Sequence, residues 1–151
     1  MESLFDRSAS EEIRQRLLSL QPDSQRLWGK MSSAQMLAHC SASLEMAMGR
    51  LRPPRLLIGS IIGRAVKSLV LREGEPMRRN APTAKALKVA AGDGDFVKEK
   101  SRLDGLIDCF AASGPGGCTT HPHCFFGRLT PEEWSVLMYK HLDHHLRQFG
   151  A

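Results

Sequence analysis

One segment constrains the fold more than any other. Between Ser32 and Gly49 the only charged residue is Glu45. Ser32 and Gln35 fit a capping box, in which a hydroxyl and an amide three residues later satisfy free N–H groups at a helix start, and Gly49 is placed to end the helix. A helix that is apolar on nearly every side must be covered on nearly every side. We therefore expect this helix at the centre of the fold.

Three more helices are expected to cover it. They run from Ser8 or Ser10 to Pro22, from Asp95 to Ala112, and from Thr130 to about Phe149. The last has its cap at Thr130, proline at its first position and two glutamates in its first turn, all favourable there. No segment alternates over enough residues to predict a strand. We predict an all-α chain, a four-helix bundle with one domain over residues 1–151 and a loop-rich insertion between the second and third helices.

The insertion, residues 50–92, is strongly basic. It holds ten Lys or Arg against two acids, so it carries +8 while the remainder of the chain carries −3. Pro53-Pro54 forces an irregular joint, residues 56–71 form a short helix loosened by two glycines, and an extended passage follows. The charge is either a solvated surface or a contact for phosphates, an acidic substrate or a membrane surface. Because only this segment argues for a nucleic-acid or membrane partner, we expect neither.

The composition indicates a cytoplasmic protein. No apolar run is long enough to span a bilayer, because charges and glycines interrupt residues 56–71. The N-terminus lacks a basic patch followed by an apolar stretch, so we expect no signal peptide. The four cysteines are therefore expected to stay reduced.

Two histidines of the last helix are expected to face the core. Steps of a helical turn from Trp134 pass through Met138, His141, His145 and Phe149, an apolar stripe interrupted by two imidazoles. His144 falls on the opposite, mostly polar side. His141 and His145 are four residues apart and therefore share a helix face.

His39 supplies a third imidazole from the middle of the buried helix. Each neutral ring carries one donor and one acceptor, and burying either unpaired is costly. One metal ion would satisfy the lone pairs of His39, His141 and His145 together, leaving three N–H groups for other acceptors. The alternative is that each is an ordinary hydrogen-bonded core histidine.

A rival set of ligands lies between the third and fourth helices. It comprises Cys118, His121, His123 and Cys124. Structural zinc sites usually use two ligand pairs separated by a longer loop, and four ligands within seven residues that include Pro122 can rarely all reach one ion. His123 or Cys124 could instead lie at the mouth of the main site.

Two stretches of the chain carry a family resemblance. They are Trp28-Gly29-Lys30-Met31 with Ala34-Gln35-Met36-Leu37-Ala38-His39-Cys40, and residues 125–134 leading into His141-Leu142-Asp143-His144-His145. In both, the sequence resembles the DinB-like superfamily, in particular a branch known only as a domain of unknown function. The resemblance implies an up-up-down-down bundle, often dimeric. It also implies a three-histidine site for a divalent ion such as Ni²⁺, Zn²⁺ or Fe²⁺ on His39, His141 and His145.

Two function classes follow. Characterised members of that superfamily include hydrolases and transferases that use a low-molecular-weight thiol, so a metal-dependent enzyme acting on a small-molecule substrate is the first hypothesis. The basic insertion is not typical of the superfamily, and the branch has no assigned reaction. The second hypothesis is a non-catalytic bundle, a homodimer or partner-binding module whose metal is structural or vestigial.

Overall fold

A computed structural model of the chain describes residues 1–80, 87 and 94–151. These residues form five α-helices and one 3-10 turn. The elements are α1 (Arg7–Ser19), α2 (Ser33–Ala47), α3 (Leu57–Val70), α4 (Phe96–Ser113), η2 (Gly114–Gly117) and α5 (Pro131–Gln148). The described residues contain no strand, only an isolated bridge between His123 and Gly127. The predicted all-helical class is confirmed, while part of the loop-rich passage, residues 81–86 and 88–93, lies outside the described residues.

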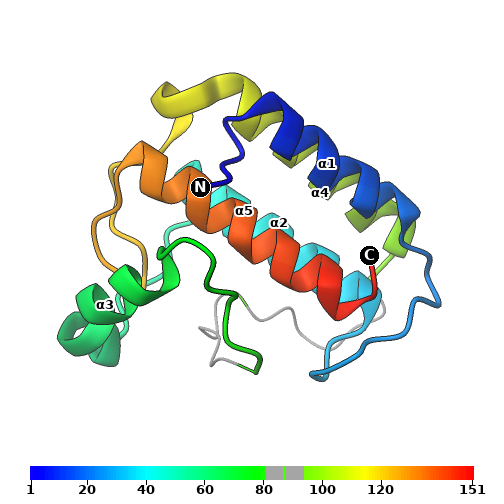
Figure 1. The fold of residues 1–151 in the computed structure, drawn as a ribbon, viewed down its shortest axis with the longest axis horizontal. Coiled ribbons are helices and arrows are strands. Elements are labelled where there is room, and N and C mark those ends of the chain that lie inside the picture. The colour runs from blue at the N-terminus through cyan, green and yellow to red at the C-terminus, as the bar shows by residue number, and fades with distance from the viewer. Residues whose placement is uncertain (81–86, 88–93) are drawn as a thin grey trace.

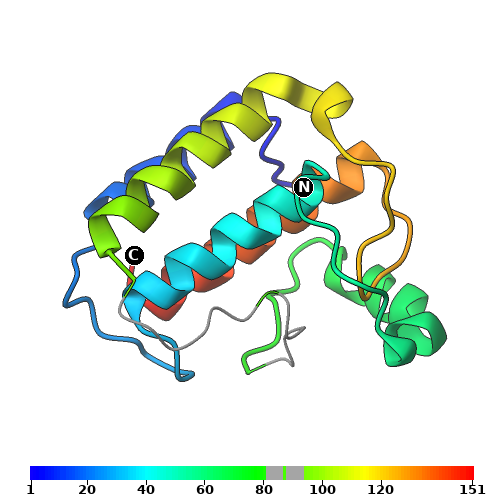
Figure 2. The ribbon, with the colours of Figure 1, turned by 180° about the vertical axis from the view of Figure 1, so that it is seen from behind.

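Four of the helices enclose the core. In Figures 1 and 2, α1 and α5 lie on one side of the molecule and α2 and α4 on the other, and each helix contacts two of the other three. α1 and α5 run in one direction, and α2 and α4 run in the other. The chain order is therefore up-down-down-up, and the up-up-down-down order implied by the resemblance is wrong. The chain reverses direction in the first connection, residues 20–32, and again between α4 and α5, whereas α2 and α4 run parallel.

The predicted capping box at Ser32 and the predicted cap at Thr130 are both present. The Ser32 side chain accepts from the backbone N–H of Gln35 at the start of α2, and the Gln35 side chain accepts from the backbone N–H of Ser32. Thr130 and Glu133 make the same reciprocal pair at the start of α5. Because these contacts lie within one helical turn, residue type alone predicts where α2 and α5 begin.

The central position of α2 is confirmed by its burial. Twelve of its 15 residues are buried, and its neighbours α4 and α5 supply the facing side chains. Fully buried residues of the common core include Ile13, Leu37, Leu44, Ile107 and Trp134. Glu45, the only charged residue of α2, forms an ion pair with Arg102 of α4, at 2.8 Å, on the outside of the bundle.

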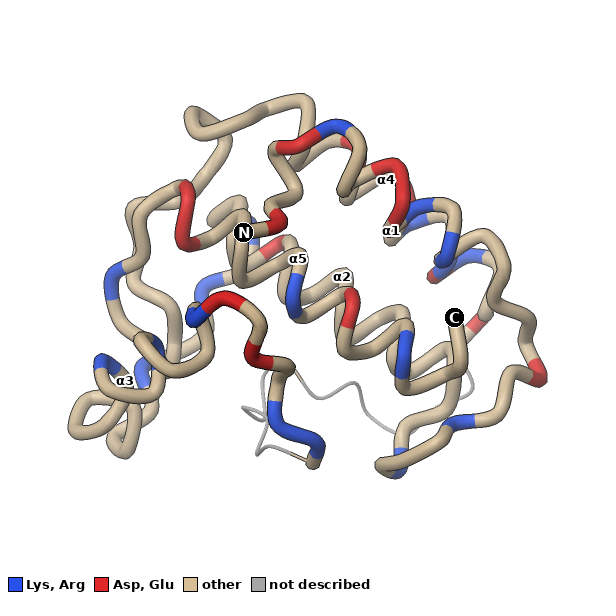
Figure 3. Tube along the Cα trace, in the orientation of Figure 1, with Lys and Arg blue, Asp and Glu red and all other residues tan. Residues whose placement is uncertain are grey.

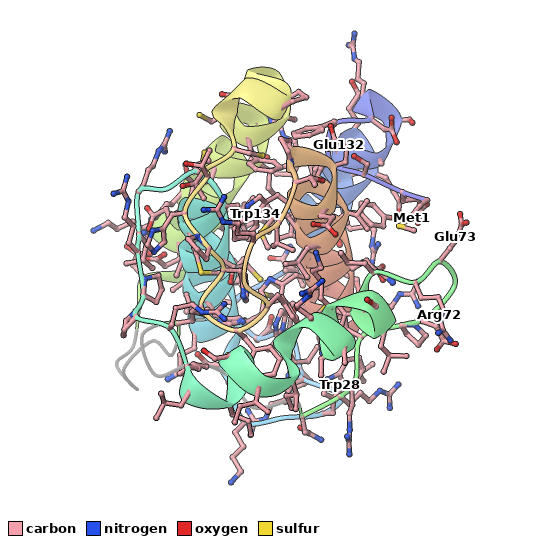
Figure 4. The ribbon with its side chains drawn as sticks, turned by 90° about the vertical axis from the view of Figure 1, so that its left-hand side faces the viewer. Met1, Trp28, Arg72, Glu73, Glu132 and Trp134 are labelled. Atoms are coloured by element: carbon pink, nitrogen blue, oxygen red, sulfur yellow. The ribbon has the colours of Figure 1, made fainter. Side chains whose placement is uncertain are left out.

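The fifth helix, α3, packs differently from the other four. It lies across one end of the bundle, beyond the N-terminus of α5, as Figure 4 shows in the foreground, with Arg72 and Glu73 in the turn after it. Gly59 and Gly63 are buried against the backbone of Phe125, and a Cβ at either would lie within 2.5 Å of the Phe125 carbonyl oxygen. The predicted short helix is confirmed, and its two glycines have a role that was not predicted, because they allow its close contact with the loop.

None of the helices in the described residues has the length and apolar character needed to cross a membrane. All four cysteines, which all lie in the described part of the chain, are unpaired.

Candidate metal centre

Two of the three predicted residues project from one face of α5. His141 and His145 are one helical turn apart, and their ring centroids are separated by 4.6 Å. Trp134, Met138 and Phe149, on the same predicted stripe, are buried. The face assigned from the sequence is therefore confirmed, and it points toward α2.

His39 of α2 completes the cluster. Its ring lies 4.8 Å from that of His141 and 4.9 Å from that of His145, centre to centre. One ring nitrogen from each residue lies within 4.8 Å of the others, and the closest approach is 2.9 Å between the Nε2 atoms of His39 and His141. The structure thus brings together the three residues that were predicted to converge. We call them the three-histidine cluster. Its occupancy by an ion stays a prediction.

The backbone of Leu87 determines which nitrogen of His39 faces the cluster. Nδ1 of His39 lies 2.9 Å from the carbonyl oxygen of Leu87. A carbonyl can only accept, so Nδ1 carries the proton and donates it. The lone pair is then on Nε2, the atom directed at His141.

Gln148 has the same effect on His145. The side-chain amide nitrogen of Gln148 donates to the carbonyl oxygen of Trp28 at 2.7 Å. Its side-chain oxygen therefore faces Nδ1 of His145, at 2.8 Å, and accepts that proton. Nε2 of His145 keeps its lone pair. Gln148 is only 3% exposed, so this contact is shielded from water.

The third ring, that of His141, has one nitrogen without a hydrogen-bond partner. Its Nδ1 is buried and has no hydrogen-bond partner among the described residues. Nε2 of His141 faces the Nε2 lone pair of His39, so a neutral His141 without an ion leaves a lone pair unsatisfied at one nitrogen or the other. An ion between the rings would take up the Nε2 lone pairs, which is the chemical fit of this cluster to a cation.

Burial keeps all three rings neutral. It lowers the pKa of His145 to about 3, with a further contribution from the neighbouring His39. Burial also lowers the pKa of His39, against the opposing effect of its hydrogen bond to Leu87. The pKa of His141 is lowered by burial first and then by His145 and His39. Because only a neutral imidazole has a lone pair to give, the cluster is ready to ligate at neutral pH.

The distances also fit a single ion. Imidazole nitrogens bind zinc at about 2.0–2.1 Å, so two of them on one ion are at most about 4.2 Å apart. The 2.9 Å separation of His39 and His141 lies within that limit. Separations above it, up to 4.8 Å, need a small rotation of a ring to close.

His144 lies outside the cluster, as predicted, but it does not project freely into solvent. It is partly buried, and its ring packs 5.5 Å from that of Trp28. The guanidinium of Arg79 lies on Trp28, 4.1 Å from its ring centre. The loop containing Trp28 therefore closes over this end of α5.

The rival set does not form a site. Within the part of the chain that the structure describes, His39, His141 and His145 are the group of three ligand atoms close enough to hold a metal. Nδ1 of His123 instead accepts from the backbone N–H groups of Phe125 and Phe126, at 3.0 and 3.1 Å. His123 therefore holds the turn that leads to the bridge with Gly127, which is a structural role.

Three residues around the cluster were not predicted. They are Gln148, Leu87 and Gly29. Gly29 has φ +79°, and a Cβ there would lie 2.5 Å from the amide nitrogen of Gln148. The spacing of Gln148, three residues after His145 on the same helix, is the one signal that could have indicated a partner. Leu87 contributes a backbone carbonyl and leaves no such signal.

Comparison with known proteins assigns the family. A family model described as protein of unknown function (DUF1569) matches residues 3–151. The chain belongs to the DUF1569 family. The match covers nearly the whole chain. In this DUF1569 protein, both helices that carry the three-histidine cluster, α2 and α5, lie within the matched residues. No match was found among curated proteins or among solved structures.

Proposed function

We propose that this chain binds one divalent metal ion on His39, His141 and His145 and uses it to act on a small molecule. The observation that carries the proposal is the convergence of three neutral imidazoles from two helices within 4.8 Å. Three protein ligands leave at least one coordination position for water or substrate, which catalytic sites keep and structural sites close. Nickel, zinc and iron all accept imidazole nitrogen, so the ligand set suits each of them.

Two reaction classes suit such a centre, transfer of a low-molecular-weight thiol and hydrolysis. Both need a nucleophile that is deprotonated near neutral pH. A divalent ion bound here would act as a Lewis acid and lower the pKa of a thiol or water molecule at the open position. The resemblance to the DinB-like superfamily supports the same two classes.

The protein's own contribution is to orient the ligands. Leu87 and Gln148 hold the Nδ1 protons of His39 and His145, so that the Nε2 atoms point inward. Buried helix α2 fixes the position of His39. No carboxylate belongs to the cluster in the described residues, so a bound ion would keep its full positive charge, which favours an anionic nucleophile. The four unpaired cysteines support a reducing compartment, and we propose the cytoplasm.

The experiment that tests catalysis compares the apo-protein with protein reloaded with Zn²⁺, Ni²⁺ or Fe²⁺. Each form is assayed for thiol addition to electrophiles and for hydrolysis of esters and amides. We expect turnover with at least one ion, its loss on chelation and in His145→Ala, and its retention in His144→Ala. Binding of the ion that raises the melting temperature without turnover of any substrate would instead indicate the non-catalytic bundle.

A further inference from the structure

The outer face of α3 exposes large aliphatic side chains in a group. Leu57, Ile61 and Ile58 are 87%, 83% and 59% exposed. Together with Ile62 and Leu69, they make up five of the nine large hydrophobic side chains that are exposed in the described residues. Single exposed aliphatics are normal on a protein surface, but a contiguous group usually marks an interaction site.

α3 cannot bury these side chains by rotating about its own axis. Its opposite face is fixed by the close contact of Gly59 and Gly63 with the Phe125 backbone, where no side chain would fit. Lys67 on that side pairs with Glu133 of α5 at 2.7 Å. The ammonium of Lys140 donates to the carbonyl oxygens of Val70 and Arg72 and holds the end of α3. The apolar face is therefore held outward.

The segment that carries this face has charge of one sign. Residues 50–72 contain six Lys or Arg and no Asp or Glu. Figure 3 shows basic and no acidic positions along α3, in contrast to α1, α4 and α5. Arg64 and Arg72 are exposed, whereas the guanidinium of Arg55 donates to the carbonyl oxygen of His123 at 2.8 Å. An aliphatic face bordered by arginine is the composition of helices that lie in the plane of a membrane surface.

We propose that α3 docks this protein onto an anionic phospholipid surface, with Leu57, Ile58 and Ile61 inserted among the acyl chains. The arginines then contact lipid phosphates, to which they are complementary in charge. A second copy of the same helix is a poorer partner, because pairing two such segments brings the arginines of each close to those of the other. The sequence alone predicts no membrane partner, because only the charge of residues 50–92 argues for one. The structure adds an exposed aliphatic face on the same segment. This inference does not depend on the metal centre.

The test is sedimentation of the full-length protein with phosphatidylcholine vesicles that contain or lack phosphatidylserine. We expect binding to the anionic vesicles at low salt, little binding to the neutral ones, and loss of binding at high salt. Ile61→Glu and, independently, Leu57→Glu should each weaken binding by at least about tenfold, because each removes an aliphatic side chain from the acyl region. The matched control is Val97→Glu on α4, a 70% exposed aliphatic position away from α3, which should bind as the wild type does.

The proposal is overturned if both α3 variants bind anionic vesicles as tightly as the wild type while retaining its circular dichroism and melting temperature. Equal binding to neutral and anionic vesicles overturns it too. So does a dimer of the wild-type chain, seen by sedimentation equilibrium, that Ile61→Glu converts to monomer, because the face would then belong to a second copy.

Discussion

Nδ1 of His145 donates its proton to the side-chain oxygen of Gln148 at 2.8 Å, and this contact orients the lone pair of His145 toward His39 and His141. The side-chain amide of Gln148 cannot flip without losing its other hydrogen bond, from its nitrogen to the carbonyl oxygen of Trp28. One buried side chain thus links the orientation of a candidate ligand to the loop that covers the end of α5.

Substitution of Gln148 should weaken metal binding although Gln148 is not itself a candidate ligand. In Gln148→Ala the His145 ring loses its acceptor and the preference for the tautomer with a free Nε2. We expect the affinity for Zn²⁺, measured by competition with a chromophoric chelator, to fall about 10- to 100-fold. Gln15→Ala, at an exposed position of α1, is the control. An unchanged affinity in Gln148→Ala would contradict the orienting role.

Gly29 should not tolerate a side chain. Its φ of +79° disfavours any residue with a Cβ, and that Cβ would lie 2.5 Å from the amide nitrogen of Gln148. We expect Gly29→Ala to lower the free energy of unfolding in urea by about 1–3 kcal/mol. A Cβ at Gly105 of α4 would meet no atom within 4 Å, so Gly105→Ala should instead raise stability by about 0.5–1 kcal/mol. Equal effects of the two substitutions would refute the argument from local crowding.

Stability of the metal-free protein should fall in acid partly because of His123. Burial lowers its pKa to about 4 in the folded protein, from 6.5 when unfolded. Between these values the unfolded chain binds the extra proton, so the free energy of unfolding decreases as the pH falls from about 6.5 to about 4. The loss due to His123 is on the order of 3 kcal/mol.

The matched variant for this measurement is His123→Asn. An asparagine oxygen can accept from the N–H groups of Phe125 and Phe126 in place of Nδ1, but it does not titrate. Urea unfolding at pH 7 and pH 5 in the presence of chelator should show a smaller pH dependence in this variant than in the wild type. The same dependence in both would mean that His123 is not the group responsible.

Metal should stabilise the folded chain through the three-histidine cluster. An ion that binds only the folded state, present at a hundred times its Kd, raises the free energy of unfolding by about 2.7 kcal/mol. We expect a rise in melting temperature on addition of Zn²⁺ or Ni²⁺ to the wild type and no rise in His141→Ala. A rise of the same size in that variant would place the stabilising ion elsewhere.

What could be predicted from the sequence depends on local patterns. The caps at Ser32 and Thr130 and the inward face of α5 were predicted because they involve residues within one or two helical turns. The single charge on α2 indicated its central position, since a helix without a polar face has to be buried. Together with the family resemblance, these patterns supported the prediction that His39, His141 and His145 converge.

What could not be predicted depends on contacts between distant segments. The direction of α2 relative to α1 depends on how residues 20–32 cross the bundle, and composition does not encode it. The close packing of Gly59 and Gly63 on Phe125, and the acceptor role of Leu87, involve backbone atoms of other segments. The glycines were interpreted only for their effect within the helix, so their contact with the Phe125 backbone was not predicted.

One ion held by three imidazoles is the central claim, and metal content measured by inductively coupled plasma mass spectrometry tests it most directly. Wild type, His39→Ala and His144→Ala are each loaded with Zn²⁺, freed of excess ion on a desalting column and assayed. We expect about one ion per chain in the wild type and in His144→Ala, and almost none in His39→Ala, because two imidazoles hold zinc far more weakly than three. Equal zinc content in wild type and His39→Ala would contradict the claim.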